Sequence, residues 1–177
     1  MAAASHLTGD WSGVRKRLQH AAKACESHLQ QALLREGIRL ADNIKINITQ
    51  GGRWANKPFL PNADSTIGRK KSSAPLINSG DLRNAVAAHR LKPDTVLVGI
   101  AGDASRKNRP IGSYIAQYAQ LHEFGAEWTT KKGKQRILPK RAFILPVLNY
   151  TCKARQKAWR QELTELFKAP SRKTKKT

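Results

Sequence analysis

Acidic residues are scarce in this sequence, which holds 12 Asp and Glu against 33 Lys and Arg in 177 residues. The formal net charge of +21 creates a field that attracts polyanions. A two-carboxylate reaction centre needs acids that converge, and these acids are scattered along the chain. The imbalance therefore favours nucleic acid, an anionic membrane or an acidic protein surface as partner, and it counts against a nuclease.

Cysteine and long apolar runs are also scarce. Cys25 and Cys152 form no C-x-x-C pair and fall on separate predicted helices, so we interpret them as reduced thiols packed as small apolar side chains in a cytoplasmic protein. No apolar run approaches the roughly 18 residues of a membrane-spanning helix. Because the first residues also lack the pattern of a secretory signal, we expect no membrane partner.

Sequence motifs of catalysis are absent as well: there is no P-loop, no G-x-G-x-x-G and no G-x-S-x-G. His122 and Glu123 are the only adjacent histidine and carboxylate. Neighbours on a helix point about 100° apart, so these two do not easily share a metal ion. We therefore expect His122 to be a structural histidine, and we expect no metal and no cofactor.

Length and composition predict one domain over residues 1–168, followed by a flexible basic tail over 169–177. Apolar residues recurring every three or four positions predict a helix over 12–49. Its length of about 55 Å would exceed the width of such a domain, so part of it should project or pack on a neighbouring chain. The alternative is a break near Gly37. Residues 51–75 are predicted to be an irregular basic loop.

An α+β core is predicted for residues 76–168, with one helix over 113–124 and a final helix over 145–168. Turn residues between short apolar runs predict two β-hairpins, 85–91 with 95–100 and 126–130 with 135–138. We expect the hairpins to form one antiparallel sheet of about four strands, packed against the two helices.

The excess positive charge gathers in four clusters, whereas segment 76–100 carries only three basic and two acidic residues. The absence of interleaved aromatic residues favours contacts with phosphates over recognition of bases. We expect the clusters to face DNA or an acidic neighbouring protein. They are Arg69, Lys70 and Lys71; Arg106, Lys107 and Arg109; Lys131, Lys132 and Lys134; and Arg172, Lys173, Lys175 and Lys176.

Five short motifs follow one another between residues 54 and 148. They are Trp54; Pro75-Leu76-x-x-Ser79-Gly80-x-Leu82; Val96-x-Val98-Gly99; Tyr118-Ala119-x-x-His122-x-Phe124-Gly125; and Ile137-x-Pro139-x-Arg141-x-Phe143-Ile144. In this order they resemble the phage virion-morphogenesis or tail-completion proteins, a group that includes the Mu G-like proteins and related siphophage neck proteins. The chain departs from that pattern by a basic insertion between Val98-Gly99 and Tyr118-Ala119 and by its strong net charge.

The resemblance implies a structural neck protein of a tailed phage, without catalysis, assembled in the host cytoplasm and located in the virion. Such proteins complete the tail or the head–tail joint, typically as a ring around the DNA channel, for which we take a hexamer as the working number. Expected partners are the head-connector and tail-terminator or tail-tube proteins, and phage DNA through non-specific phosphate contacts. The matched residues would have structural or interface roles.

Individual motif residues carry their own expectations. Gly125 should adopt a positive φ after a helix. Tyr118 and Phe124 should pack that helix onto the sheet, and Phe143 should anchor the last helix. Arg141 should pair with a carboxylate, either across a subunit joint or within its own chain. The alternative function, from another class, is a basic nucleic-acid-binding protein that acts through phosphate contacts.

Overall fold

The computed structural model describes residues 11–100, 115–131 and 133–167. The expected α+β class is confirmed, and no helix within these residues is long and apolar enough to cross a membrane. In chain order the elements are α1 (Trp11–Thr49), η1 (Arg53–Ala55), α2 (Asp64–Lys70), α3 (Asp81–Asn84), β1 (Val86–Lys92), β2 (Thr95–Ile100), α4 (Ile115–Phe124), β3 (Ala126–Thr129), β4 (Gln135–Leu138) and α5 (Leu145–Phe167).

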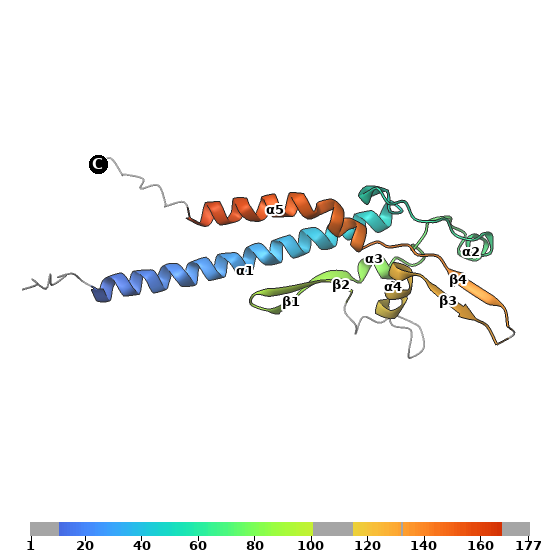
Figure 1. Cartoon of the computed structure of the whole chain (residues 1–177), viewed down its shortest axis with the longest axis horizontal. Helices are drawn as coiled ribbons and strands as arrows, with labels where there is room; N and C mark the ends of the chain where they lie inside the picture. The colour runs from blue at the N-terminus through green and yellow to red at the C-terminus, as the bar shows by residue number, and fades with distance from the viewer. Residues whose placement is uncertain (1–10, 101–114, 132, 168–177) are drawn as a thin grey trace, which may run out of the picture.

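The long helix α1 is unbroken, so the prediction of a long helix is confirmed and the alternative of a break at Gly37 is wrong. Gly37 is buried, and a Cβ atom there would lie 2.7 Å from Cγ1 of Val96 and 3.3 Å from Cβ of Ala88. The glycine therefore lets β1 and β2 approach the helix closely. Figure 1 shows α5 running back alongside α1, and α1 extending past both α5 and β1–β2 at its N-terminal end.

The four strands form two separate antiparallel sheets of two strands each, and the prediction of one four-stranded sheet is wrong. β1 pairs with β2 in the register Val86↔Ile100, and this hairpin packs along α1. β3 pairs with β4 in the register Ala126↔Leu138. β3 and β4 have four residues each. All of these residues are exposed except Ala126 and Leu138, which pair at the base of the hairpin. The second hairpin therefore has few buried side chains that could hold it against the first sheet.

The hydrophobic core lies between the C-terminal half of α1 and the elements that cover it. The core residues of α1 are Leu40, Ala41, Ile44 and Ile48. Phe143, two residues before α5, and Val147, in the first turn of α5, pack into the same cluster, and both are fully buried. The start of α5 is thus anchored in the core, as expected for Phe143.

Segment 51–75 is more regular than predicted, because it contains η1 and α2. It begins with a tight turn in which the N–H of Phe59 donates to the carbonyl of Gly51 at 2.8 Å. Gly52 has a φ of +85°, and a Cβ atom there would lie 2.1 Å from the Lys57 carbonyl oxygen. The turn therefore requires glycine at position 52. It places residues 57–59 across a cavity from the start of α5.

Candidate functional site

The last turn of α4 is tied to the start of α5 by the buried carboxylate of Glu123. Its Oε2 accepts the N–H of Phe143 at 2.8 Å and of Ile144 at 3.1 Å, and its Oε1 accepts the N–H of Leu145 at 3.0 Å. Donors at a helix start have no partner within the helix, and a negative charge there is favourable. The sequence suggested Glu123 only as a possible metal ligand and did not predict that it connects α4 to the start of α5.

The backbone strengthens the same junction. The N–H of Arg141 donates to the carbonyl of His122 at 2.8 Å. Gly125 has a φ of +80°, which confirms the expected positive φ, and a Cβ atom there would lie 3.2 Å from the carbonyl oxygen of Leu138. The positive φ of Gly125 lets the chain turn from α4 into β3. The missing side chain lets Leu138, at the end of β4, pass close to this turn. The motifs around His122 and Arg141 are thus one structural unit.

Arg141 is buried and connects this unit to segment 51–75. Its Nε donates to the carbonyl of Leu60 and its Nη2 to the carbonyl of Pro61, both at 2.7 Å. Burial lowers the pKa of the guanidinium below its usual value. The intrachain ion pair that the sequence suggested is replaced by these two bonds to backbone carbonyls. A contact across a subunit joint stays a prediction.

His122 lies beside Arg141 and is buried. Its ring meets the ring of Tyr118 edge to face, with centroids 4.4 Å apart, and its Nδ1 has no hydrogen-bond partner in the described part of the chain. Burial, followed by the positive charges of Arg141 and Lys70, lowers the pKa of His122 to about 4. The imidazole is therefore neutral at pH 7. The structural role expected of His122 stays a prediction.

The outer face of α4 departs from expectation. Ile115, Ala119 and His122 point inward and are buried, whereas Tyr118 is 47% and Phe124 is 68% exposed. The expectation that Tyr118 and Phe124 pack the helix onto a sheet is wrong. The reason is that the two hairpins form separate sheets, so in the described part of the chain no four-stranded sheet packs against this face of α4.

The remaining motif residues lie in ordinary structural positions. Trp54 is half-buried, and its ring meets Tyr150 of α5 edge to face with centroids 5.3 Å apart. The hydroxyl of Ser79 donates to Oδ2 of Asp81 at 2.6 Å. Gly80, with a φ of +83°, precedes α3, and Leu82 is buried in the core; Pro139 is half-buried.

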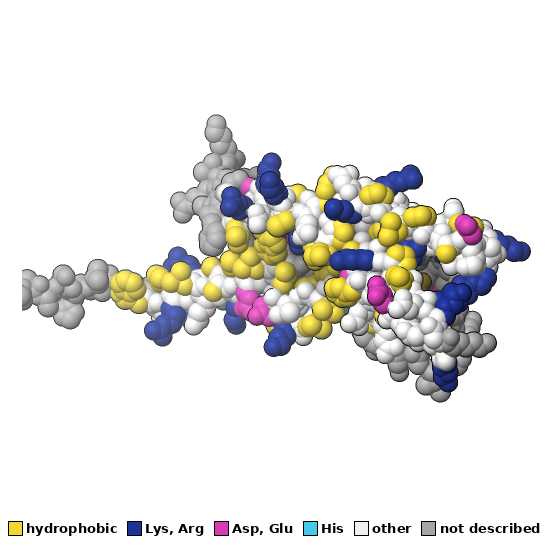
Figure 2. Space-filling view, turned by 45° about the vertical axis from the view of Figure 1, so that its right-hand side comes forward, with side chains coloured by type: hydrophobic (Ala, Val, Ile, Leu, Met, Phe, Trp, Pro, Cys, Tyr) yellow, Lys and Arg dark blue, Asp and Glu magenta, His cyan; other side chains and the backbone are white. Residues whose placement is uncertain are grey.

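Two of the four basic clusters fall within the described residues. Arg69 and Lys71 are exposed near the end of α2, and Lys131 and Lys134 are exposed at the tip of the β3–β4 hairpin. Both elements lie at the end of the long axis opposite the start of α1 (Figure 1), and Figure 2 shows several Lys and Arg side chains at that end. Outside the described residues lie Arg106, Lys107, Arg109, Lys132, Arg172, Lys173, Lys175 and Lys176.

Lys70 differs from its two neighbours. It is half-buried, and its Nζ donates to the carbonyl of Ala74 at 3.1 Å. Burial, and then the charge of Arg141, lowers the pKa of its ammonium group. Lys70 therefore stabilises its own loop, and Arg69 and Lys71 are the members of this cluster that can contact a partner.

Both cysteines lie in the described ranges as free thiols. Within them, no group of three His, Cys, Asp or Glu residues could hold a metal ion. Cys25 is half-buried, but Cys152 is exposed, so the prediction that both thiols are packed is wrong for Cys152. Cys152 lies on α5 beyond the buried start of that helix, where its side chain is exposed to solvent.

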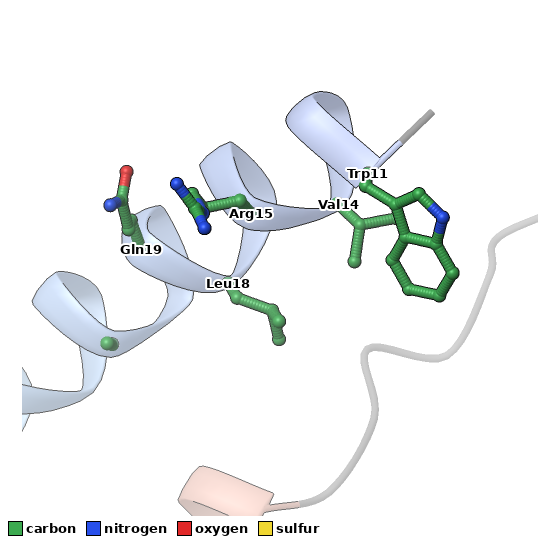
Figure 3. A pocket seen from close by; sticks show the side chains of 6 residues that line it. Trp11, Val14, Arg15, Leu18 and Gln19 are labelled. Carbon is green, nitrogen blue, oxygen red and sulfur yellow. The ribbon is translucent and has the colours of Figure 1, made fainter. Parts of the chain in front are cut away.

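The projecting start of α1 carries a shallow apolar pocket (Figure 3). Trp11, Val14 and Leu18 are 59%, 40% and 66% exposed. Val14 and Leu18 point to the same side of the helix in Figure 3, with the Trp11 indole beside Val14. The projecting end of the molecule thus exposes apolar side chains beside the basic side chains of Arg15, Lys16 and Arg17, and the opposite end exposes the two described basic clusters.

Comparison of the chain with protein-family models, with curated proteins and with solved structures finds no match.

Proposed function

We propose that this chain is a structural neck protein of a tailed phage, which completes the tail or the head–tail joint as a ring around the DNA channel. It acts without catalysis and is located in the virion after assembly in the host cytoplasm. The observation that carries the proposal is the ordered set of five motifs. Two of these, around His122 and around Arg141, join at the α4–α5 junction through Glu123.

The bonding of this junction supports a scaffold role. Glu123 and Arg141 direct their side chains to backbone groups of their own chain. Catalytic acids and bases need to reach a substrate. Side chains committed to the backbone instead rigidify the joint between segment 51–75, α4 and α5.

Exposed apolar side chains support assembly into a ring. Trp11 and Leu18 lie at one end of the molecule, and Phe124 and Ile137, each 68% exposed, lie on α4 and β4. Apolar patches of this kind mark interaction sites in soluble proteins. We assign them to contacts between copies, in a closed ring of on the order of six. Head-connector and tail-terminator or tail-tube proteins adjoin the ring.

The net charge sets a condition on that ring. Copies that each carry +21 repel one another, and salt or an anionic template reduces the repulsion. The end of each copy that carries Arg69, Lys71, Lys131 and Lys134 faces the DNA or an acidic neighbouring ring. Phosphate contacts without recognition of bases suit a channel through which DNA must pass regardless of its sequence.

Native mass spectrometry of nuclease-treated protein over a salt series tests the ring. We expect one discrete high oligomer whose share grows with salt, since screening relieves the repulsion. The matched measurement adds a purified connector ring or tail as template at low salt. A monomer at every salt concentration, with and without the template, would contradict the proposal.

The charge itself favours a second function, a basic protein that binds nucleic acid through phosphates. Arg69→Glu with Lys71→Glu distinguishes the two, with Lys16→Glu and Lys23→Glu on α1 as the charge-matched control. A nucleic-acid binder should lose affinity for duplex DNA in the first variant only, and its salt slope should fall by roughly 0.9 per lost contact. A neck protein should still assemble in both variants, and to a similarly increased extent in each, because both lower the positive charge of every copy by the same amount.

A further inference from the structure

A cavity of about 450 Å³ lies between segment 55–59 and the start of α5. Phe59 and Tyr150 form its aromatic sides, and Leu145 and Pro146 form an aliphatic wall. Its volume lies in the range of sites that accept one or two side chains or a small molecule. Leu145 is 51% and Tyr150 is 56% exposed, so the cavity opens to solvent.

Hydrogen bonds from two buried side chains hold the two walls together, so the cavity is formed before a ligand binds. The fully buried side chain of Asn47 donates through Nδ2 to the Phe143 carbonyl at 3.3 Å and accepts the N–H of Ala55 through Oδ1 at 3.1 Å. Arg141 bonds the carbonyls of Leu60 and Pro61 from the opposite wall. A site whose walls are already fixed loses little entropy on binding.

The charge of the lining has one sign. Lys57 and Lys140 are exposed on opposite walls, the buried Arg141 also belongs to the lining, and no Asp or Glu among the described residues lines the cavity. The anion-binding capacity of the α5 N-terminus is already used, because Glu123 accepts the N–H groups of Phe143, Ile144 and Leu145. Any external carboxylate would therefore bind the two lysines.

We propose that this cavity binds an acidic peptide segment of a partner protein, with one apolar side chain inserted and flanking carboxylates on Lys57 and Lys140. The amide of Asn149 lies at the lining, where it can bond the peptide backbone. The aliphatic wall and the edge-on packing of Tyr150 against Trp54 suit a side chain better than a stacked base. The inference does not depend on the proposed function, since no step uses a ring.

The test measures binding of a labelled peptide of about ten residues to the full-length protein by fluorescence anisotropy at about 150 mM salt. The probe has one Phe flanked by Asp and Glu in a Gly-Ser background. We expect Lys57→Glu with Lys140→Glu to weaken binding at least about tenfold, and Leu145→Ser to weaken it several-fold. Lys131→Glu with Lys134→Glu, the same charge change at the β3–β4 tip, should stay within about twofold.

Changes in the probe test the proposal without altering the protein. Peptides with Ala in place of Phe, or with Asn and Gln in place of the acids, should each bind at least about tenfold more weakly. Equal loss in the two lysine pairs, or equal binding of the Ala peptide, would show charge attraction alone and overturn the proposal. Oligothymidine is the second probe. If the variants at Lys57, Lys140 and Leu145 weaken its binding as they are expected to weaken binding of the peptide, the proposal is overturned in favour of a nucleotide site.

Discussion

The two halves of α1 share one sequence pattern and differ in everything that surrounds them. In the C-terminal half, Ile44 and Ile48 are fully buried under β1–β2, α5 and the loops. In the N-terminal half, Val14 and Leu18 lie at equivalent helical spacing and are 40% and 66% exposed. Periodicity thus predicts that a face is apolar, but not that the same chain covers it.

The difference has an energetic consequence. Isolated helices shorter than about 12–15 residues are marginal in water, and most helical stability in proteins comes from packing of an apolar face. The C-terminal half of α1 has that packing within its own chain. The N-terminal half depends on continuity with the packed half and, in our proposal, on a second copy.

The largest expected effect belongs to the packed end. Phe143→Ala removes a fully buried ring between α1 and α5, and we expect the free energy of unfolding to fall by about 3–5 kcal/mol. Urea denaturation followed by circular dichroism measures the loss. Leu163→Ala on α5, where the side chain is 40% exposed, is the matched control and should cost less than about 1 kcal/mol. Equal losses in the two variants would contradict the comparison.

The second effect is a pH dependence from His122, also in the packed end. Its pKa is lowered from 6.5 to about 4 in the folded protein, so between these values the unfolded chain binds a proton that the folded chain does not. Stability should therefore fall as the pH drops from about 6.5 to about 4, by about 3 kcal/mol, and this contribution should level off below. Above pH 6.5 the histidine is neutral in both states and adds no slope.

His122→Gln isolates this effect from the titrating carboxylates, because only the difference between the two proteins reports the histidine. We expect the variant to lose less stability than the natural sequence over the same pH range, measured by urea denaturation at several pH values. NMR titration of the His122 ring gives its pKa directly. A midpoint near 6.5 would show that the ring is not held in the neutral form by burial.

The sequence predicted most elements but not their assembly. Alternating apolar residues around Lys92-Pro93-Asp94 located the first hairpin, and the second was found in the same way. That the hairpins stay apart depends on β3 and β4, whose side chains are largely exposed. Pairing between distant strands is decided by tertiary packing, which local pattern does not encode.

The candidate site shows the same limit. Motif spacing singled out His122 and Arg141, but the residues that join the site, Glu123 and Asn47, gave no local signal beyond being polar in apolar surroundings. Glu123 accepts backbone N–H groups about 20 positions away, and Asn47 bonds backbone groups 8 and 96 positions away in the chain. A buried polar residue on a helix otherwise apolar on that face was the signal available for Asn47.

The smallest expected effect on stability lies at the projecting end. Leu18→Ser changes a side chain that is 66% exposed, so the free energy of unfolding of the monomer should change by less than about 0.5 kcal/mol. Its effect on assembly should be large, because a polar hydroxyl replaces an apolar contact that we assign to a second copy. Native mass spectrometry at the salt concentration where the natural protein forms its oligomer measures this directly.

Lys16→Ser is the matched control, since it alters an exposed polar position on the same projecting turns and leaves the apolar stripe intact. It should preserve the oligomer, or increase it slightly by removing one positive charge. If Leu18→Ser assembles as well as the natural protein, the apolar stripe of α1 is not the contact between copies. The exposed side chains of Phe124 and Ile137 would then be the surface to vary, because among the described residues they are the most exposed large apolar ones outside α1.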